Sequence, residues 1–498
     1  MKRVALFSPL PPSASGIADY TSDLLPSLAE DLDLEVYVDG ECDHQPKLGR
    51  DVRVHNWHVF EKEQRRQGYD AIVYQMGNSE HHHYMYPFAL RYPGVLVLHE
   101  LVLHHLVFGL TGGAGHWPLY VLSMLDSHGR DGLIGARRVA VEGGAPEFFE
   151  FPLSSGLVRR SRAVIVHSQF MRDALCRMAP HIPTHVVPQV AVETRVGAPD
   201  TACSAAARRE LGLPPDGYHI GAFGLVTPNK RLDVVLRAVR QLLTNVPRAY
   251  LVVVGEISPA WNFQALIHEL GINQHVILTG RTSLEDFHRY MDAMDVTVAL
   301  RYPTAGETSG SLIRLLAAGK PTITSKVGWF GELPEFVCPQ IEVDEFEEQT
   351  LVAILRWLYE RPDLRRRLAA NAQAYARRHH SLDATTHGYL EVIRDVADGA
   401  QRINDDELTQ AFFQTFIADH ALEEQLKTNC HGSNHVVTQP SIPHVFIRHL
   451  ARRLVDSDVV PEFGSAFEKT LAEGMLSLRR ATRTPEPSHA QQADMGSH

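Results

Sequence analysis

Residues 301–335 read RYPTAGETSGSLIRLLAAGKPTITSKVGWFGELPE, and this stretch decides the fold. An apolar strand-like run at 296–300 leads into a loop rich in glycine, serine and proline. Apolar residues then recur at helical spacing over 311–318, and Gly319 with Pro321 is a typical helix stop. A helix that starts at a glycine-rich loop offers unpaired backbone N–H groups and a partial positive charge. The stretch therefore predicts a seat for a phosphate or a sugar hydroxyl.

The quoted stretch belongs to a long alternation of apolar strand-like runs and amphipathic helical patterns. Strand-like runs occur at 4–7, 34–38, 71–74, 95–98, 164–166, 219–223, 250–254, 276–279 and 296–300. This alternation predicts parallel sheets with helices on both faces, and ligands bind at the carboxyl ends of such strands. Prolines and glycines gather at 187–215, which indicates a linker between two domains of this kind.

The loop, helix, stop and following strand resemble the donor-binding motif of retaining glycosyltransferases of family 4, which have the GT-B fold. The acidic residue of that motif corresponds to Glu307, and its Gly-x-Pro stop corresponds to residues 319–321. The resemblance covers about residues 1–400 and implies the fold class α/β, with two Rossmann-like doubly wound domains facing a cleft. The expected parts are an acceptor domain at 1–190, a donor-binding domain at 205–383, a crossover helix at 384–400, a C-terminal helical extension at 401–481 and a disordered tail at 482–498.

The resemblance implies roles for residues that follow the strands. Lys230 would hold the donor diphosphate, His99 would contact the donor sugar, and Glu307 would bind sugar hydroxyls, so these three are the catalytic candidates. Fixed cations and a helix dipole can stabilise the charge that develops on a leaving diphosphate. The further donor-binding candidates are Ser15, Gly16, Gly224, Arg231, Glu256, Arg301, Gly306, Thr308, Ser309, Gly310 and Ser311. Asn78 and Glu100 are the acceptor-binding candidates.

The chain departs from the family pattern at Arg314, where the family has a second glutamate that holds the nucleotide ribose. A guanidinium group has no acceptor for ribose hydroxyls. An unpaired arginine at a closed site is costly, so we expect Arg314 to pair with Glu307 or Glu335. Backbone groups or Glu256 would then hold the ribose. The family often has an arginine where this chain has Leu225, and we expect Arg231 or Arg301 to supply that guanidinium.

Composition excludes several classes of protein. The formal net charge of −11 disfavours a general nucleic-acid binder. No apolar run reaches 18 residues, and the N-terminus lacks a signal-peptide cleavage site. Five scattered cysteines fit a cytoplasmic protein with free thiols, and peripheral membrane association stays open. Neither the Asp-Leu-Asp run at 31–33 nor the histidine run at 81–83 is interpreted as a metal site, and no cofactor is expected besides the sugar donor.

We expect a retaining glycosyltransferase that moves a hexose-like sugar from a nucleotide-diphosphate sugar to a hydroxyl of a glycan, a lipid-linked glycan or another metabolite. Two alternatives are a non-catalytic subunit that binds nucleotide sugars for a partner enzyme, and a GT-B epimerase of the nucleotide sugar. Helical patterns at 407–426, 443–457 and 463–478 form the extension. They predict a packed subdomain, a homo-oligomer interface, or a surface for a partner or a membrane.

Overall fold

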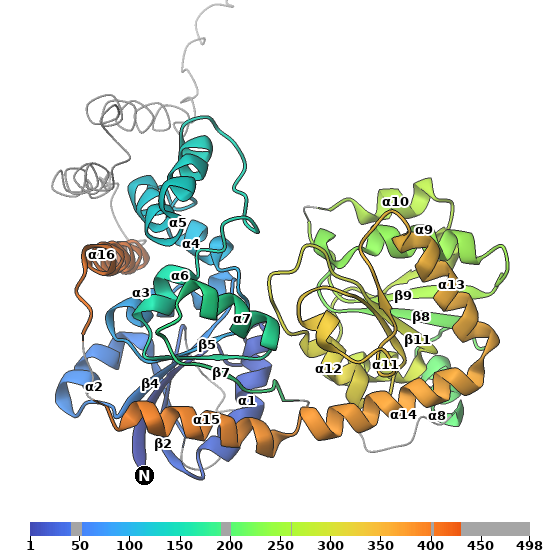
Figure 1. Ribbon diagram of the computed structural model, residues 1–498, viewed down its shortest axis with the longest axis horizontal. Helices are drawn as coiled ribbons and strands as arrows, with labels where there is room; N and C mark the ends of the chain where they lie inside the picture. The colour runs from blue at the N-terminus through green and yellow to red at the C-terminus, as the bar shows by residue number, and fades with distance from the viewer. Residues whose placement is uncertain (41–51, 191–200, 260, 400–402, 430–498) are drawn as a thin grey trace, which may run out of the picture. The chain divides into compact units, whose positions relative to one another are not determined.

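A computed structural model describes residues 1–40, 52–190, 201–259, 261–399 and 403–429. The chain divides into two compact units, residues 1–109 with 148–416 and residues 110–147 with 417–498, and each is described by itself. The expected helices at 443–457 and 463–478 and the tail at 482–498 lie outside the described residues. The first unit contains two parallel sheets with helices on both faces of each (Figure 1).

The first sheet has seven described strands in the order β3-β2-β1-β4-β5-β6-β7, all parallel. They are β1 (Lys2–Phe7), β2 (Leu32–Val38), β3 (Arg53–Asn56), β4 (Ala71–Met76), β5 (Val95–Leu98), β6 (Ala163–Val166) and β7 (Thr184–Val186). Its helices are α1 (Gly16–Leu28), η1 (Trp57–Val59), α2 (Phe60–Arg66), η2 (Glu80–His82), α3 (Met85–Arg91), α4 (His104–Leu110), α6 (Ser155–Arg160) and α7 (Gln169–Met178). The central strands are buried throughout because helices cover both faces of the sheet.

The second sheet has the order β10-β9-β8-β11-β12-β13, which again consists of parallel pairs. Its strands are β8 (Tyr218–Phe223), β9 (Ala249–Val254), β10 (Val276–Leu278), β11 (Val296–Ala299), β12 (Thr322–Ser325) and β13 (Gln340–Ile341). Its helices are α8 (Thr201–Glu210), η3 (Pro228–Lys230), α9 (Leu232–Leu242), α10 (Phe263–Glu269), η4 (Asn273–His275), α11 (Leu284–Ala293), α12 (Gly310–Ala317), η5 (Gly328–Glu332), α13 (Glu347–Glu360) and α14 (Pro362–His379). Both sheets agree with the predicted Rossmann-like architecture.

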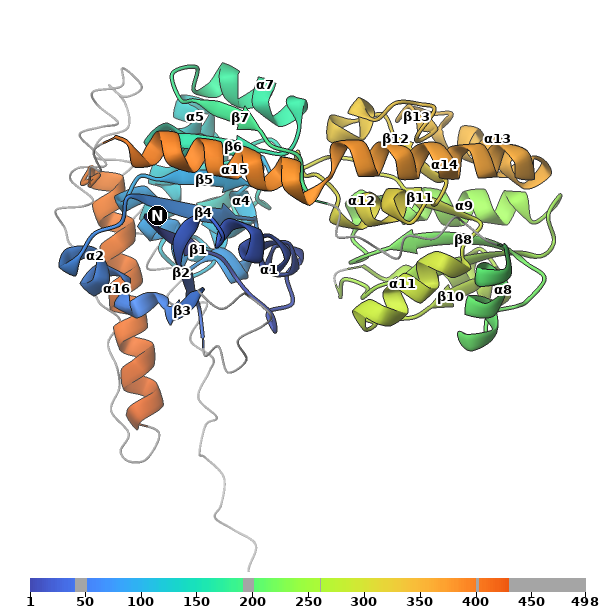
Figure 2. The same cartoon turned by 90° about the horizontal axis from the view of Figure 1, so that it is seen from below.

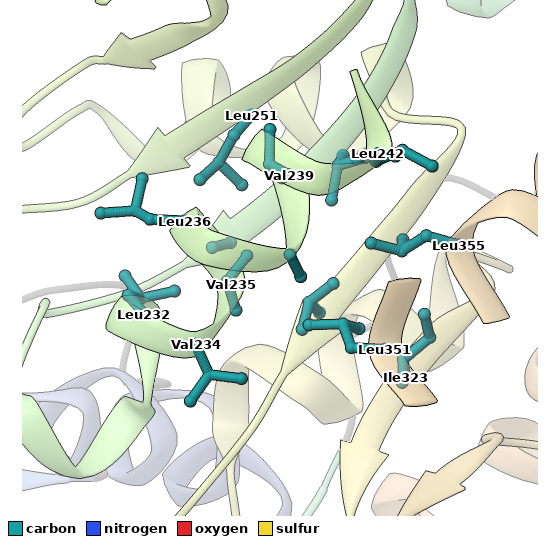
Figure 3. Close-up of a cluster of buried hydrophobic side chains, with 14 of the residues drawn as sticks. Leu232, Val234, Val235, Leu236, Val239, Leu242, Leu251, Ile323, Leu351 and Leu355 are labelled. Atoms are coloured by element: carbon teal, nitrogen blue, oxygen red, sulfur yellow. The ribbon is translucent and has the colours of Figure 1, made fainter. Parts of the chain in front are cut away.

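The core of the second domain forms where α9 packs against the strands of the second sheet and against α13. Apolar residues recur along α9 at helical spacing, and Val235 and Val239 are fully buried. Figure 3 shows these side chains grouped with Leu251 of β9 and with Leu351 and Leu355 of α13. This packing fixes the start of α9, and therefore the loop that joins β8 to α9.

The crossover helix expected at 384–400 is found as α15 (Leu382–Ala397). Figure 2 shows α14 and α15 in succession, with α15 over the strands of the first sheet. Tyr389 and Ile393 of α15 are fully buried in the core of the first sheet. The Tyr20 hydroxyl donates a hydrogen bond to the Tyr389 hydroxyl at 3.0 Å. The last helix of the family core thus completes the first domain.

The helix expected at 407–426 is found as α16 (Glu407–Asn429). Its first part buries Phe412, Phe413 and Phe416, which pack on Tyr86, Phe88 and Trp57 of the first domain. In the second unit, described helix α5 (Trp117–Ala140) is preceded by His116, whose Nε2 lies 2.8 Å from Oδ2 of Asp419. Among the described residues, no helix is long and apolar enough to cross a membrane.

A buried carboxylate, Glu35 of β2, organises the outer strands of the first sheet. Its Oε1 accepts hydrogen bonds from Arg3 at 2.8 Å and Arg53 at 2.9 Å, and its Oε2 accepts one from the Tyr69 hydroxyl. These hydrogen bonds outweigh the effect of burial and lower the pKa of Glu35 to about 2.

The Asp-Leu-Asp run is explained by neighbouring arginines. Asp33 pairs with Arg53 at 2.7 Å, and Asp31 pairs with Arg394 of α15 at 2.6 Å. Both carboxylates therefore have structural partners.

We predict that Glu35→Gln destabilises the first domain at pH 7 by roughly 3 kcal/mol, the linkage value for a carboxyl whose pKa falls from 4.5 to about 2. Because the folded-state pKa is depressed, the contribution is present above about pH 5 and is lost as the pH falls toward 2. The measurement is the urea midpoint of wild type and variant at pH 7 and pH 3. Glu345→Gln, at an exposed position, is the control. An equal effect at both pH values would contradict the assignment.

Candidate active site

The loop between β8 and α9 presents Lys230 at the carboxyl end of the second sheet. Lys230 ends η3, and its Nζ donates a hydrogen bond to the Phe223 carbonyl oxygen at 3.0 Å. Gly224 has a φ of 85°, and a Cβ there would lie 2.9 Å from that Nζ. The turn therefore requires glycine for its backbone conformation, and a Cβ would also make Nζ at the end of the lysine side chain shift. Burial, and then the charge of Arg301, lower the pKa of Lys230 to about 7.

Lys230 faces a small cavity of about 20 Å³ at the start of α12. Arg301, Ser309 and Ser311 line the same cavity. Ser309 caps α12, because its Oγ accepts a hydrogen bond from the Leu312 N–H at 3.3 Å. Two cations, two hydroxyls and a helix N-terminus around one cavity form an environment suited to a phosphate group.

Glu307 is held by three neighbours in the loop before α12. Its Oε1 lies 2.7 Å from Nε of Arg301, although that N–H is not aligned for a hydrogen bond. Its Oε2 accepts hydrogen bonds from the Thr304 hydroxyl at 3.0 Å and the Ala305 N–H at 2.8 Å. The carboxylate offsets the charge of Arg301, whose guanidinium is buried and lies 5.3 Å from the Phe330 ring centroid.

Glu100 follows β5 of the first sheet and lies beside the Glu307 loop. The Leu101 and Val102 N–H groups both donate to the Ala305 carbonyl oxygen, at 2.7 and 3.1 Å. A Cβ on Gly306, whose φ is 81°, would lie 2.7 Å from Cβ of Leu101, so this approach requires glycine. Burial, and then the charge of Glu307, raise the pKa of Glu100 to about 7.

His99 uses both ring nitrogens within the protein. Its Nε2 lies 2.7 Å from the side-chain amide of Gln75, and its Nδ1 lies 3.2 Å from Nε2 of His167. His167 Nδ1 is 2.8 Å from the Val187 carbonyl oxygen, which can only accept, so this nitrogen carries the proton. Burial lowers the pKa of both histidines. The Gln75 atom that faces His99 Nε2 is Oε1, which can only accept, so Nε2 donates to it in this arrangement.

Several predicted donor-binding residues lie apart from the cavity at Lys230. Arg231 pairs with Glu347 of α13, so Arg301 is the guanidinium beside Lys230. Glu256 is exposed, and its backbone carbonyl accepts from the Val226 N–H at 2.7 Å. Ser15 caps α1 through the Ile17 N–H at 3.3 Å, and a Cβ on Gly16 would meet nothing within 4 Å. Their roles toward a donor stay predictions.

Two further predicted residues lie in the loop before α12 and at the start of that helix. The Thr308 hydroxyl is buried without a hydrogen-bond partner among the described residues, so it is available to a ligand. Gly310 starts α12, and a Cβ there would lie 3.5 Å from Nε2 of Gln189, which is an ordinary contact. Gly310 is therefore not required by packing against its described neighbours.

Arg314 does not pair with Glu307 or Glu335, so that expectation is wrong. Glu307 is already paired with Arg301, and Arg314 forms no ion pair among the described residues. Burial raises the pKa of Asp23 on α1 to about 6, and the charge of Arg314 opposes this rise. The partner comes from another domain, which neighbours in sequence could not indicate.

Sequence reasoning also missed Glu332, a residue of the second domain that contacts helix α7 of the first domain. Its carboxylate accepts hydrogen bonds from the Gln169 N–H at 3.1 Å and the Phe170 N–H at 2.5 Å, at the start of α7. An acidic group at a helix N-terminus is favourable. Ser168 is the N-cap of α7, and a serine before a helical pattern is a recognisable start signal. The sequence around Glu332 does not indicate that it contacts this helix.

Comparisons with known proteins agree with this fold. Residues 204–375 match the family model described as Glycosyl transferases group 1. D-inositol 3-phosphate glycosyltransferase from Segniliparus rotundus is 27% identical over 312 residues, covering 60% of this chain and 67% of the relative. The enzyme of the same name from Thermomonospora curvata is 31% identical, covering 39% of this chain and 46% of the relative. The chain thus spans between about half and two thirds of these relatives' length.

Solved structures share the fold over most of the chain. HepE from Anabaena, in complex with UDP-glucose, superposes with a TM-score of 0.55 at 18% identity, covering 79% of this chain and 100% of that one. Sucrose-phosphate synthase from Thermosynechococcus elongatus gives a TM-score of 0.58 at 17% identity, covering 80% of this chain and 99% of that one. The two parallel sheets and these superpositions show the GT-B fold that the resemblance predicted. The match to the group 1 glycosyltransferase family model lies in the second domain of this chain.

We predict that Lys230→Ala weakens binding of a nucleoside diphosphate and lowers turnover by a factor on the order of a hundred, because a buried cation beside the phosphate is lost. Wild-type affinity should also fall as the pH rises through about 7, where Lys230 loses its proton. Lys230→Arg should remove that part of the pH dependence, since arginine stays charged. Calorimetric titration measures the affinities, and nucleotide release measures the turnover.

The exposed Lys62 on α2 provides the matched control for this prediction. Lys62→Ala should bind the nucleoside diphosphate like wild type at every pH. Unchanged affinity and turnover in Lys230→Ala would show that the diphosphate binds elsewhere.

A second prediction concerns the charge of Arg314 beside Asp23. Arg314→Glu should lower the thermal unfolding midpoint at pH 7, because two carboxylates then face each other. The double variant Asp23→Arg with Arg314→Glu should recover the loss, with a coupling energy on the order of 1 kcal/mol. Additive effects in this double-mutant cycle, measured by thermal unfolding, would disprove an electrostatic interaction between Arg314 and Asp23.

Proposed function

We propose that the protein is a retaining hexosyltransferase that moves a hexose from a nucleoside-diphosphate sugar to an acceptor hydroxyl. The observation that carries this proposal is the cavity at the start of α12, where Lys230 and Arg301 lie with Ser309 and Ser311. HepE from Anabaena, which shares the fold, binds UDP-glucose, so uridine diphosphate glucose is the first donor to test. The acceptor class is a hydroxyl compound such as a glycan or a lipid-linked glycan.

The chemical step needs charge stabilisation more than a protein nucleophile. The acceptor oxygen forms a bond to the anomeric carbon while the bond from that carbon to the diphosphate oxygen breaks. Lys230 and Arg301 stabilise the negative charge on the leaving diphosphate. The acceptor proton passes to the leaving phosphate oxygen on the same face of the sugar, so the configuration is retained.

The surroundings of Glu307 support a binding role. Its two oxygens already contact Arg301, the Thr304 hydroxyl and the Ala305 N–H. A carboxylate with these partners is a weaker nucleophile but keeps lone pairs for sugar hydroxyls. Neither a non-catalytic nucleotide-sugar subunit nor an epimerase is favoured by a specific feature of the described site.

The direct test incubates the full chain with uridine, guanosine and adenosine diphosphate sugars, with and without a panel of hydroxyl acceptors. We expect acceptor-dependent release of nucleotide, and proton NMR of the product should show the donor's anomeric configuration. Binding without release would support the non-catalytic alternative. Interconversion of the free donor would support an epimerase, and an inverted product would exclude the retaining mechanism.

A further inference from the structure

We propose that the second domain carries a further binding site, for a neutral oligosaccharide, in the groove between the end of α9 and the outer face of α13. The groove has a volume of about 360 Å³. Its lining residues are Gln241, Asn245, Gln349, Val352, Ala353, Arg356, Trp357 and Glu360. They are separate from the residues that line the cavity at Lys230. The site goes beyond the proposed function, because it takes part in no step of sugar transfer.

The α13 side of the groove is a single helical stripe. Its lining residues occupy positions i, i+3, i+4, i+7, i+8 and i+11 from 349 to 360, which lie on one face of a helix. A different face of α13 packs on α9 through Leu351 and Leu355, which are fully buried (Figure 3). Of the stripe, Val352 alone packs against this core. The rest of the stripe is therefore available to a ligand without loss of the core.

Trp357 provides the aromatic surface of the groove. It is 50% exposed, and in the part of the chain that the structure describes its indole contacts no other aromatic ring. Ala353, one turn earlier in α13, is too small to cover the indole. The C–H groups on one face of a sugar ring can pack on such a surface, and the indole N–H is a donor for a hydroxyl.

Amide side chains supply the polar groups that a sugar needs. The side chains of Asn245 and Gln349 are exposed and form no hydrogen bond with any described residue. The Gln241 amide donates to Glu348, which leaves its oxygen as an acceptor. An amide presents a donor and an acceptor in one plane, and neighbouring hydroxyls of a sugar can bind both.

The charges of the groove favour a neutral ligand. Arg356 and Glu360 are the charged residues of its lining, and Arg356 Nε donates to Glu360 Oε1 at 2.8 Å. Their charges offset each other, so neither an anion nor a cation finds an unpaired partner there. The remaining guanidinium N–H groups and the second carboxylate oxygen can still bind hydroxyls.

The same composition disfavours a protein partner. The cores of protein–protein interfaces are depleted of charged residues and enriched in aromatic ones. This groove instead places an ion pair and three amides around the single aromatic ring of its lining, Trp357. We therefore assign the groove to a ligand that is rich in hydroxyl groups.

The groove lies at the far end of α9 from the donor cavity. Leu232, at the start of α9, lines the cavity, whereas Gln241, at its end, lines the groove. The 11 residues of α9 span roughly 16 Å. A sugar in the groove is therefore too far from Lys230 to react and is held by binding alone. An oligosaccharide held there raises the local concentration of the glycan at the enzyme.

The experiment titrates the full chain with maltoheptaose, cellohexaose and mannohexaose, and with hexagalacturonic acid as a charged probe. Calorimetry measures the dissociation constants, and indole fluorescence monitors Trp357. We expect at least one neutral oligosaccharide to bind with a Kd on the order of 1 mM. Hexagalacturonic acid should bind at least about tenfold more weakly. No binding of any neutral oligosaccharide at about 10 mM, or a preference for the charged probe, would overturn the inference.

Substitutions place the bound oligosaccharide in the groove. Trp357→Ala should raise the Kd about tenfold, and Trp357→Tyr should restore most of the affinity, because an aromatic face is kept. Phe346→Ala is the matched control, since Phe346 is 60% exposed, directly precedes α13 and does not line the groove. Thermal unfolding checks that each variant is folded.

Two results with these variants would contradict the site. One is an unchanged Kd in folded Trp357→Ala, which would place the oligosaccharide elsewhere. The other is a change of oligomeric state in Trp357→Ala, measured by analytical ultracentrifugation, which would assign the groove to a second copy of the chain. The titrations use no sugar donor, so a failure to transfer sugar would contradict the proposed function without affecting this inference.

Discussion

The ion pair between Arg301 and Glu307 is the interaction on which the site depends. Arg301 is buried beside Lys230, and two cations in one enclosed place would repel each other and cost desolvation energy. Glu307 lies 2.7 Å from Arg301 and offsets one of the charges. The remaining positive potential at the start of α12 is arranged before any ligand arrives, which is the condition for electrostatic stabilisation of a leaving group.

Close backbone approach then determines where glycine is required. Gly306 lets the donor loop reach Leu101 after β5, whereas Gly224 is required by its positive φ, because the Lys230 Nζ beside it ends a flexible side chain. Each has a positive φ, at 85° and 81°, and a Cβ on either would lie 2.9 or 2.7 Å from its neighbour. The carboxyl ends of both sheets thus contribute to one chemical environment, in which burial and Glu307 raise the pKa of Glu100 to about 7.

Local patterns predicted the fold well because they depend on local physics. Apolar strand runs, the Ser309 cap and the glycine stop of α12 follow from backbone preferences, and they identified Lys230, Glu307 and Ser311 as neighbours of the donor loop. Pairings between distant segments could not be predicted in this way. Arg231 pairs with Glu347, Arg314 acts on Asp23, and Glu332 caps α7, all of which depend on how separate elements pack.

The central claim is that the pocket at the start of α12 holds the diphosphate of the sugar donor. A crystal structure with a bound nucleoside diphosphate tests this most directly. We expect diphosphate oxygens within hydrogen-bond distance of Lys230 Nζ and of the first N–H groups of α12. A diphosphate bound elsewhere, with Lys230 still bonded to the Phe223 carbonyl oxygen and no phosphate contact to Arg301, would contradict this account.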